Sequence, residues 1–267
     1  MRIIQPLFSA RSPQPTGLGD SNFIFDARRG LHQRIETDID LGQTEFLLFY
    51  VPDHKLKEDN NFEQQYDAVA GVKDHFPDIR LNVDVCLCSY TEDGHCCVTG
   101  EPNKTEDLLQ EQATLLQKAG ADSAAPSDCQ PNTVKNIKEN LNIHVMSYST
   151  KFRSLYYKNW RDVMKISPGI FRPYQLDVDD REGAIQASIK YSNDGANELM
   201  VKPGITGLDL IHEIKERTGR PVGAYQTSGE WMGIMNDHGI LEETYEIFKR
   251  AGTDYMITYG ARQLLNK

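Results

Sequence analysis

Short apolar runs rich in β-branched and aromatic residues recur along the chain, and most are separated by stretches with apolar residues at helical spacing. Such runs predict strands, and their alternation with helical patterns predicts repeated βα units. Eight strands are predicted, at residues 3–8, 45–51, 80–88, 123–128, 142–149, 197–202, 221–226 and 254–260. Helices are predicted at residues 60–75, 104–119, 131–140, 179–195, 207–218 and 241–251.

Eight strands alternating with helices favour a closed parallel (β/α)8 barrel, a TIM barrel, which we expect to form one catalytic domain over residues 1–267. An open, doubly wound sheet has the same alternation, and periodicity does not separate the two folds. No Gly-x-Gly-x-x-Gly sequence opens the first predicted helix. A dinucleotide site of the Rossmann type therefore lacks its usual support.

Reactive side chains lie at or just beyond the ends of several predicted strands. In a parallel barrel, the loops at the C-terminal ends of the strands converge on one mouth, where the chemistry takes place. We therefore expect one rim to gather Cys86, Cys88, Ser127, Asp128, Lys151, Lys202, Ser228 and Tyr259.

Lys202 closes the apolar run ELMVK, and Lys151 follows the neighbouring predicted strand. In an apolar pocket, desolvation lowers the pKa of a lysine, and a second cation nearby lowers it further. A neutral amine can form a Schiff base with a ketone. A single strand-end lysine is more often paired or extended toward solvent. Two lysines at adjacent strand ends favour the catalytic interpretation.

The charge balance restricts the classes of partner. Lys and Arg number 29 against 39 Asp and Glu, and the formal net charge of −10 disfavours nucleic acid and anionic membranes. No secretory signal and no apolar run of about 18 residues occurs. We therefore expect a cytoplasmic protein acting on a small molecule. Five cysteines in a reducing compartment make a disulfide framework a weak interpretation.

Cys86, Cys88 and Cys96 follow a C-x-C-x7-C pattern, with the turn-forming segment SYTEDGH between the second and the third. Three thiolates can bind Zn²⁺ and leave a fourth position open for water or substrate. Buried, unreactive cysteines could give the same spacing. Cys97 and Cys129 have no evident ligand role.

Arg161 and Arg172 fall in the long connection between the fifth and sixth predicted strands, where a lid over the mouth could lie. Their planar guanidinium groups suit a carboxylate ligand. Ordinary surface solvation is the alternative that composition favours.

The segments DVCLCSYTEDGHC, APSD, VMSYSTKF, ELMVKPG, YQTSGE and KRAGTDYMITY together resemble the porphobilinogen synthase family, also called 5-aminolevulinate dehydratases. The resemblance runs from about residue 80 to the C-terminus. It implies a barrel-shaped hydro-lyase that condenses two molecules of 5-aminolevulinate to the pyrrole porphobilinogen. It also implies that Lys202 forms the Schiff base, that Lys151 is the second active-site lysine, and that Zn²⁺ is bound by Cys86, Cys88 and Cys96.

The same resemblance assigns the substrate-binding groups. Ser228 and Tyr259 match residues that hold the carboxylate of the first substrate, and Arg161 and Gln175 match residues that hold that of the second. Asp84 and Tyr157 match active-site positions. In the lid, Arg172 stands beside Phe171 where the family has two adjacent arginines.

Other departures from the family concern assembly and the second substrate. The N-terminal arm used for octamer assembly is missing, so we expect a homo-oligomer smaller than an octamer. Residues 129–133 read Cys-Gln-Pro-Asn-Thr in place of Met-Met-Asp-Gly-Arg, and YYKNWR, with Lys158 and Trp160, replaces Phe-Tyr-Gly-Pro-Phe-Arg. Two alternatives therefore stay open: a Schiff-base enzyme that uses another partner, and a binding protein without catalysis.

Overall fold

The computed structural model describes residues 1–19, 22–52, 55, 62–167 and 170–266, and in it a ring of parallel strands closes on itself. β10 pairs with β1 in parallel, with Ile3 opposite Met256, so the sheet has no open edge between these two strands. The closed barrel is therefore confirmed, and the open sheet is excluded. The ring consists of β1 (Arg2–Ala10), β4 (Glu45–Tyr50), β5 (Arg80–Val85), β6 (Ser123–Pro126), β7 (His144–Lys151), β8 (Glu198–Lys202), β9 (Val222–Tyr225) and β10 (Tyr255–Ile257).

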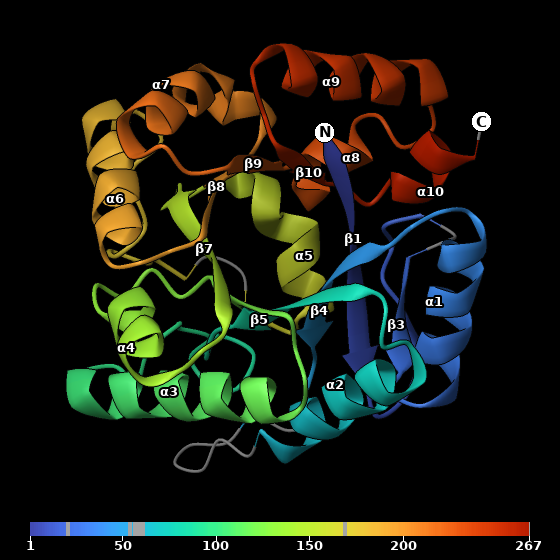
Figure 1. Ribbon diagram of the computed structural model, residues 1–267, viewed down its shortest axis with the longest axis horizontal. Coiled ribbons are helices and arrows are strands. Elements are labelled where there is room, and N and C mark those ends of the chain that lie inside the picture. The colour runs from blue at the N-terminus through green and yellow to red at the C-terminus, as the bar shows by residue number, and fades with distance from the viewer. Residues whose placement is uncertain (20–21, 53–54, 56–61, 168–169, 267) are drawn as a thin grey trace.

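Helices surround this ring of strands (Figure 1). Each buries one face, as in α7, where Leu210, Ile211 and Ile214 are buried. α7 ends where Gly219 adopts φ 64°, a left-handed conformation that glycine reaches without steric cost. The outer helices are α1 (Arg29–Asp40), α2 (Glu63–His75), α3 (Pro102–Lys118), α4 (Thr133–Asn140), α6 (Arg181–Asn193), α7 (Leu208–Thr218) and α9 (His238–Arg250).

Ion pairs close the N-terminal end of the barrel. Arg2 Nη2 lies 2.7 Å from Glu198 Oε1, and Arg2 Nη1 lies 3.1 Å from Glu45 Oε1. Arg80 approaches the same two carboxylates, at 3.2 Å from Glu45 and 3.5 Å from Glu198. These residues stand at the first positions of four strands. The polar network therefore fills one end of the barrel, and the opposite end is left for the site.

Three sequence predictions need correction. The strand predicted at 80–88 ends at Val85, because the Cys86 N–H donates to the side chain of Gln112 rather than to a neighbouring strand. The strand predicted at 254–260 ends at Ile257. The pattern also missed α1 and an N-terminal hairpin of β2 (Gln14–Pro15) and β3 (Phe23–Asp26). The start of the helix predicted at 60–75 lies partly outside the described residues.

Short helices lie among the loops that follow the strands. η1 (Leu155–Tyr157) and α5 (Lys158–Val163) follow β7, and α5 crosses the middle of the ring in Figure 1. The others are η2 (Ile205–Gly207), α8 (Ser228–Met232) and α10 (Ala261–Leu265). Within the described residues, no helix has the length and apolar character needed to cross a membrane.

Candidate active site

A narrow, nearly closed cavity lies at the C-terminal end of the barrel. Both predicted lysines, both lid arginines and two of the three predicted metal ligands contribute to its wall. The lining residues are Cys88, Cys96, Lys151, Tyr157, Trp160, Arg161, Arg172, Gln175 and Lys202. The structure thus brings together residues that lie more than one hundred positions apart in the sequence.

Lys202, the last residue of β8, is buried within a box of aromatic rings. Its Nζ lies 4.1 Å from the centre of the Tyr225 ring, and 5.1 to 5.2 Å from those of Tyr148, Trp160 and Tyr157. Burial, and after it the positive charge of Lys151, lower the pKa of Lys202 to about 7. A substantial fraction of this amine is therefore neutral and nucleophilic near pH 7.

Lys151, the last residue of β7, has the opposite electrostatic environment. Burial lowers its pKa, but charge interactions with nearby cysteines, first Cys129 and then Cys96, raise it above its ordinary value. Its Nζ donates a hydrogen bond to the carbonyl oxygen of Ser127. Because the two pKa values move apart, Lys202 is suited to be a nucleophile and Lys151 a fixed cation and proton donor.

Cys86, Cys88 and Cys96, called here the cysteine cluster, are buried, and their sulfur atoms lie within 4.8 Å of one another. Cys86 Sγ and Cys88 Sγ are 3.3 Å apart. Hydrogen bonds from Cys86 and Cys88 hold the pKa of Cys96 well below its usual range, whereas burial raises that of Cys86. Three converging thiols of this kind fit a zinc site, since zinc prefers thiolate ligands.

Two outer helices support the cysteine cluster through buried glutamines that sequence reasoning did not select. Gln112 of α3 accepts the Cys86 N–H at 3.0 Å and donates to Gln65 of α2 at 2.9 Å. On the lid side, the hydroxyl oxygen of Tyr174 accepts the Cys96 N–H at 2.8 Å. The sequence offered one signal for these two residues: each is a glutamine on the apolar face of a predicted helix. A buried amide there needs a specific hydrogen-bond partner.

The arginines connect the lid to the cysteine loop. The buried Arg172 donates to the carbonyl oxygen of Gly94 at 2.7 Å and to that of Ile170 at 3.3 Å. Arg161 lies over the ring of Tyr157, with its Cζ 5.5 Å from the ring centre. Burial, and then the charge of Arg172, lower the pKa of Arg161. Arg161 and Arg172 both bring a positive charge to the same cavity, which favours binding of an anionic ligand between them.

Ser228 and Tyr259 lie behind the cavity wall rather than in it. Ser228 Oγ accepts the backbone N–H of Trp160 at 3.0 Å and donates to the carbonyl of Tyr156 at 3.3 Å. The hydroxyl of Tyr259 lies 3.2 Å from that of Tyr225. A ligand that contacts Ser228 must therefore displace one of these bonds.

The remaining predicted residues are polar groups held close to the lysines. Burial raises the pKa of Asp84 to about 6, although Lys151 draws it down, and Asp84 Oδ1 has no hydrogen-bond partner among the described residues. Burial raises the pKa of Asp128 to about 7. The Tyr157 hydroxyl donates to the carbonyl of Lys202 at 2.9 Å. Gln175 lines the cavity, and its Oε1 also lacks a partner in the described part of the chain.

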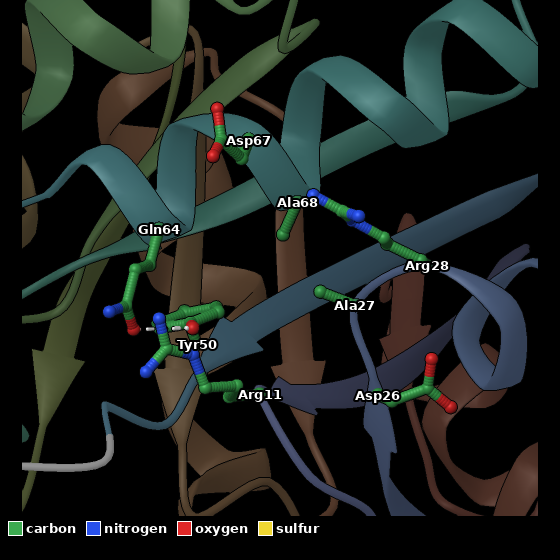
Figure 2. Close-up of a pocket in the computed structure, with 8 residues that line it drawn as sticks. All are labelled: Arg11, Asp26, Ala27, Arg28, Tyr50, Gln64, Asp67 and Ala68. Carbon is green, nitrogen blue, oxygen red and sulfur yellow. Dashed lines mark hydrogen bonds between the residues drawn. The ribbon is translucent and has the colours of Figure 1, made fainter.

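A second, larger hollow, of about 420 Å³, lies outside this cavity, beside the ends of β1 and β4 (Figure 2). At its edge the Tyr50 hydroxyl donates to Gln64 at 2.9 Å. Its lining residues are Arg11, Asp26, Ala27, Arg28, Tyr50, Gln64, Asp67 and Ala68. None of them carries an amine or thiol, so Schiff-base chemistry belongs to the smaller cavity.

Residues 21–267 match the family model described as delta-aminolevulinic acid dehydratase. The chain belongs to this family. A delta-aminolevulinic acid dehydratase of Helicobacter pylori is 34% identical over 260 residues, which cover 88% of this chain and 80% of that protein. One from Pongo abelii is 34% identical over 264 residues, with the same coverage.

Solved structures agree with this assignment. The crystal structure of the dehydratase from Toxoplasma gondii, in complex with its reaction product porphobilinogen, superposes with a TM-score of 0.90 at 28% identity and covers 99% of this chain and 84% of that one. Dihydropteroate synthase from Xanthomonas albilineans has a TM-score of 0.55 at 12% identity, which shows a shared barrel fold alone. The family resemblance inferred from the sequence motifs is thus confirmed.

Proposed function

We propose that this chain is a hydro-lyase that condenses two molecules of 5-aminolevulinate to porphobilinogen, with loss of two waters, in one barrel formed by residues 1–267. The observation that carries the proposal is the buried Lys202, whose pKa is about 7 and whose amine lies in an aromatic box next to a second lysine. Membership of the dehydratase family and the cysteine cluster support the same chemistry.

Lys202 performs the covalent step. Its neutral Nζ attacks the ketone carbon of the first substrate, and the carbonyl oxygen takes up a proton to give a carbinolamine. Loss of water then leaves an iminium ion, which withdraws electrons from the adjacent carbon. The ring of Tyr225, 4.1 Å from Nζ, stabilises the positive charge of that iminium ion. Lys151 is protonated before this step and supplies a proton to the departing oxygen, which leaves as water.

The carboxylates of the two substrates bind on different sides of the cavity. Ser228 and Tyr259 hold the first, once Ser228 gives up its bond to the carbonyl of Tyr156. Arg161, Arg172 and Gln175 hold the second, because their side chains line the cavity from the lid.

Asp84 and Tyr157 keep the reacting amines in place. Asp84 is buried, and the charge of Lys151 acts on it. Tyr157 binds the carbonyl of Lys202 and so fixes the end of β8.

Cys86, Cys88 and Cys96 would hold a Zn²⁺ ion, whose donor set they match. When bound, this ion supplies Lewis-acid polarisation of the second substrate. All three cysteines belong to the segment that follows β5, so no strand of the barrel has to move to bring their sulfur atoms together.

Borohydride trapping in the presence of 5-aminolevulinate tests the function. We expect a stable mass increase on the Lys202 peptide and a pyrrole that reacts with Ehrlich's reagent, both absent in K202A and both retained in the surface variant K158A. Trapping without pyrrole formation would indicate a different second substrate. Absence of any adduct would contradict the proposal and favour a binding protein.

We also infer that the chain acts as a homo-oligomer smaller than an octamer. The support is membership of the dehydratase family, together with a motif resemblance that is recognisable only from about residue 80 onward. Light scattering coupled to size exclusion measures the mass directly. A species of eight subunits would contradict this inference.

A further inference from the structure

Trp160, on the short helix α5, covers the amine of Lys202. The centre of its ring lies 5.1 Å from Lys202 Nζ, and the ring packs edge-on against Phe49 with centroids 5.7 Å apart. The residue is only 8% exposed, and it lines the cavity. Its indole Nε1–H has no hydrogen-bond acceptor among the described residues. A buried donor left without a partner is unfavourable, so this group is prepared for an acceptor that a ligand brings.

The backbone of the same residue reaches the other end of the first-substrate site. The Trp160 N–H donates to Ser228 Oγ at 3.0 Å. Trp160 therefore extends from the amine that captures the ketone to the hydroxyl assigned to the carboxylate. A γ-keto acid that reaches from Lys202 to Ser228 would therefore pass next to Trp160.

The second tryptophan of the chain, Trp231, has the indole hydrogen bond that Trp160 lacks. Trp231 Nε1 donates to the carbonyl of Leu18 at 2.9 Å, and the residue is buried. The missing partner is thus a feature of Trp160 and of the cavity it faces.

We propose that Trp160 determines specificity for a γ-keto acid over a neutral ketone, because its indole N–H donates a hydrogen bond to the carboxylate of the substrate held at Lys202. This inference rests on the proposed Schiff-base function. A keto acid satisfies the buried donor, whereas a neutral ketone of equal length leaves it unpaired. Sites that contain such a donor discriminate strongly against ligands that lack the acceptor.

Cyanoborohydride trapping at Lys202 separates this role from simple space filling. The probes are levulinate, a γ-keto acid, and 2-pentanone, a neutral ketone with a chain of the same length. In W160F, which keeps an aromatic ring but lacks the N–H, we expect the trapping efficiency for levulinate to fall by about 10- to 150-fold, the range of a hydrogen bond to a charged group. The efficiency for 2-pentanone should stay within about twofold. K158A, on the same helix, should leave both values unchanged.

Equal losses for both ketones would overturn the inference, because the indole would then only fill space; an unchanged value for levulinate would overturn it as well. If the wild type traps neither ketone at Lys202, the proposed function itself fails. That outcome differs from one in which the wild type traps both ketones and W160F discriminates between them as the wild type does.

A second measurement does not depend on the variant's folding. In the wild-type protein labelled with ¹⁵N, levulinate should move the Trp160 indole N–H resonance downfield, while that of Trp231 stays in place. A stationary Trp160 resonance would contradict the proposal.

Discussion

Lys151 and Lys202 are register partners at the ends of the adjacent parallel strands β7 and β8. Directly paired residues on neighbouring strands point to the same side of a sheet, at a strand spacing of about 4.8 Å. Both amines therefore enter one cavity, and the charge of Lys151 lowers the pKa of Lys202. This pairing gives one neutral and one charged amine at the same pH.

The rate of Schiff-base trapping at Lys202 should rise with pH and level off above a midpoint near 7. The pKa of Lys202 is lowered to about 7, so the reactive neutral amine accumulates as pH increases through that value. In K151M the midpoint should move to higher pH, because a like charge is removed. The pH profile of borohydride incorporation measures both midpoints, with K158M as the matched control. A wild-type midpoint near 10, the value of an ordinary lysine, would show that burial does not activate this amine.

The cysteine cluster should bind one zinc ion per chain, detected by elemental mass spectrometry after gel filtration. C86S, C88S and C96S should each lose most of the metal, because the site has only three protein ligands and each is needed to hold the ion. C97S is the control, since burial raises the pKa of the Cys97 thiol to about 11 and keeps it protonated. A strong chelator should stop pyrrole formation and leave trapping at Lys202 intact. Equal metal loss in C97S and C96S would argue against this ligand set.

Replacement of Arg161 should weaken binding of the second substrate. In R161M we expect the apparent KM for 5-aminolevulinate to rise by roughly 10- to 150-fold, the range of a lost hydrogen bond to a charged group, about 1.5–3 kcal/mol. Capture of the first substrate at Lys202 should change little, because Arg161 is not one of the aromatic residues that surround the Lys202 amine. Steady-state kinetics and trapping, with the surface variant R217M as control, separate the two effects. A trapping defect as large as the KM effect would place Arg161 on the first-substrate side.

Glu198 should stabilise the barrel at neutral pH. Burial raises its pKa, but nearby His144 and the charges of Arg2 and Arg80 outweigh this and lower the pKa below its usual 4.5. A lowered carboxyl pKa adds stability that is present above the unfolded-state value and is lost as pH falls through the folded-state value. E198Q should therefore cost about 1.5–3 kcal/mol at pH 7. The difference from wild type should shrink below about pH 4.

Denaturant unfolding of wild type and E198Q at several pH values measures this difference. E242Q is the control, because Glu242 forms an exposed contact with His238 on α9. A constant difference between wild type and E198Q across the acid range would contradict the assigned role.

The sequence by itself determined the alternation of strands with helices and the identity of the reactive groups, and it favoured the barrel without excluding an open sheet. β-branched runs repeating between amphipathic segments leave few ways to bury both faces of a parallel sheet. Lys202 and Lys151 could be placed at a shared mouth for the same reason, since strand ends converge in any closed barrel. The C-x-C-x7-C spacing predicted the cysteine cluster, because a local turn brings nearby residues together without help from the rest of the fold.

Only the tertiary structure decided which groups surround these residues. The aromatic box of Lys202 comes from strands and a lid helix far apart in the chain, and no local pattern predicts that Tyr225 and Trp160 both lie next to Lys202. The bond between the Trp160 N–H and Ser228 likewise depends on how α5 packs against α8. The pKa of each lysine depends on its burial and on all the charges around it, which come from many different elements. The pKa difference between the two lysines therefore exists only once the barrel has closed.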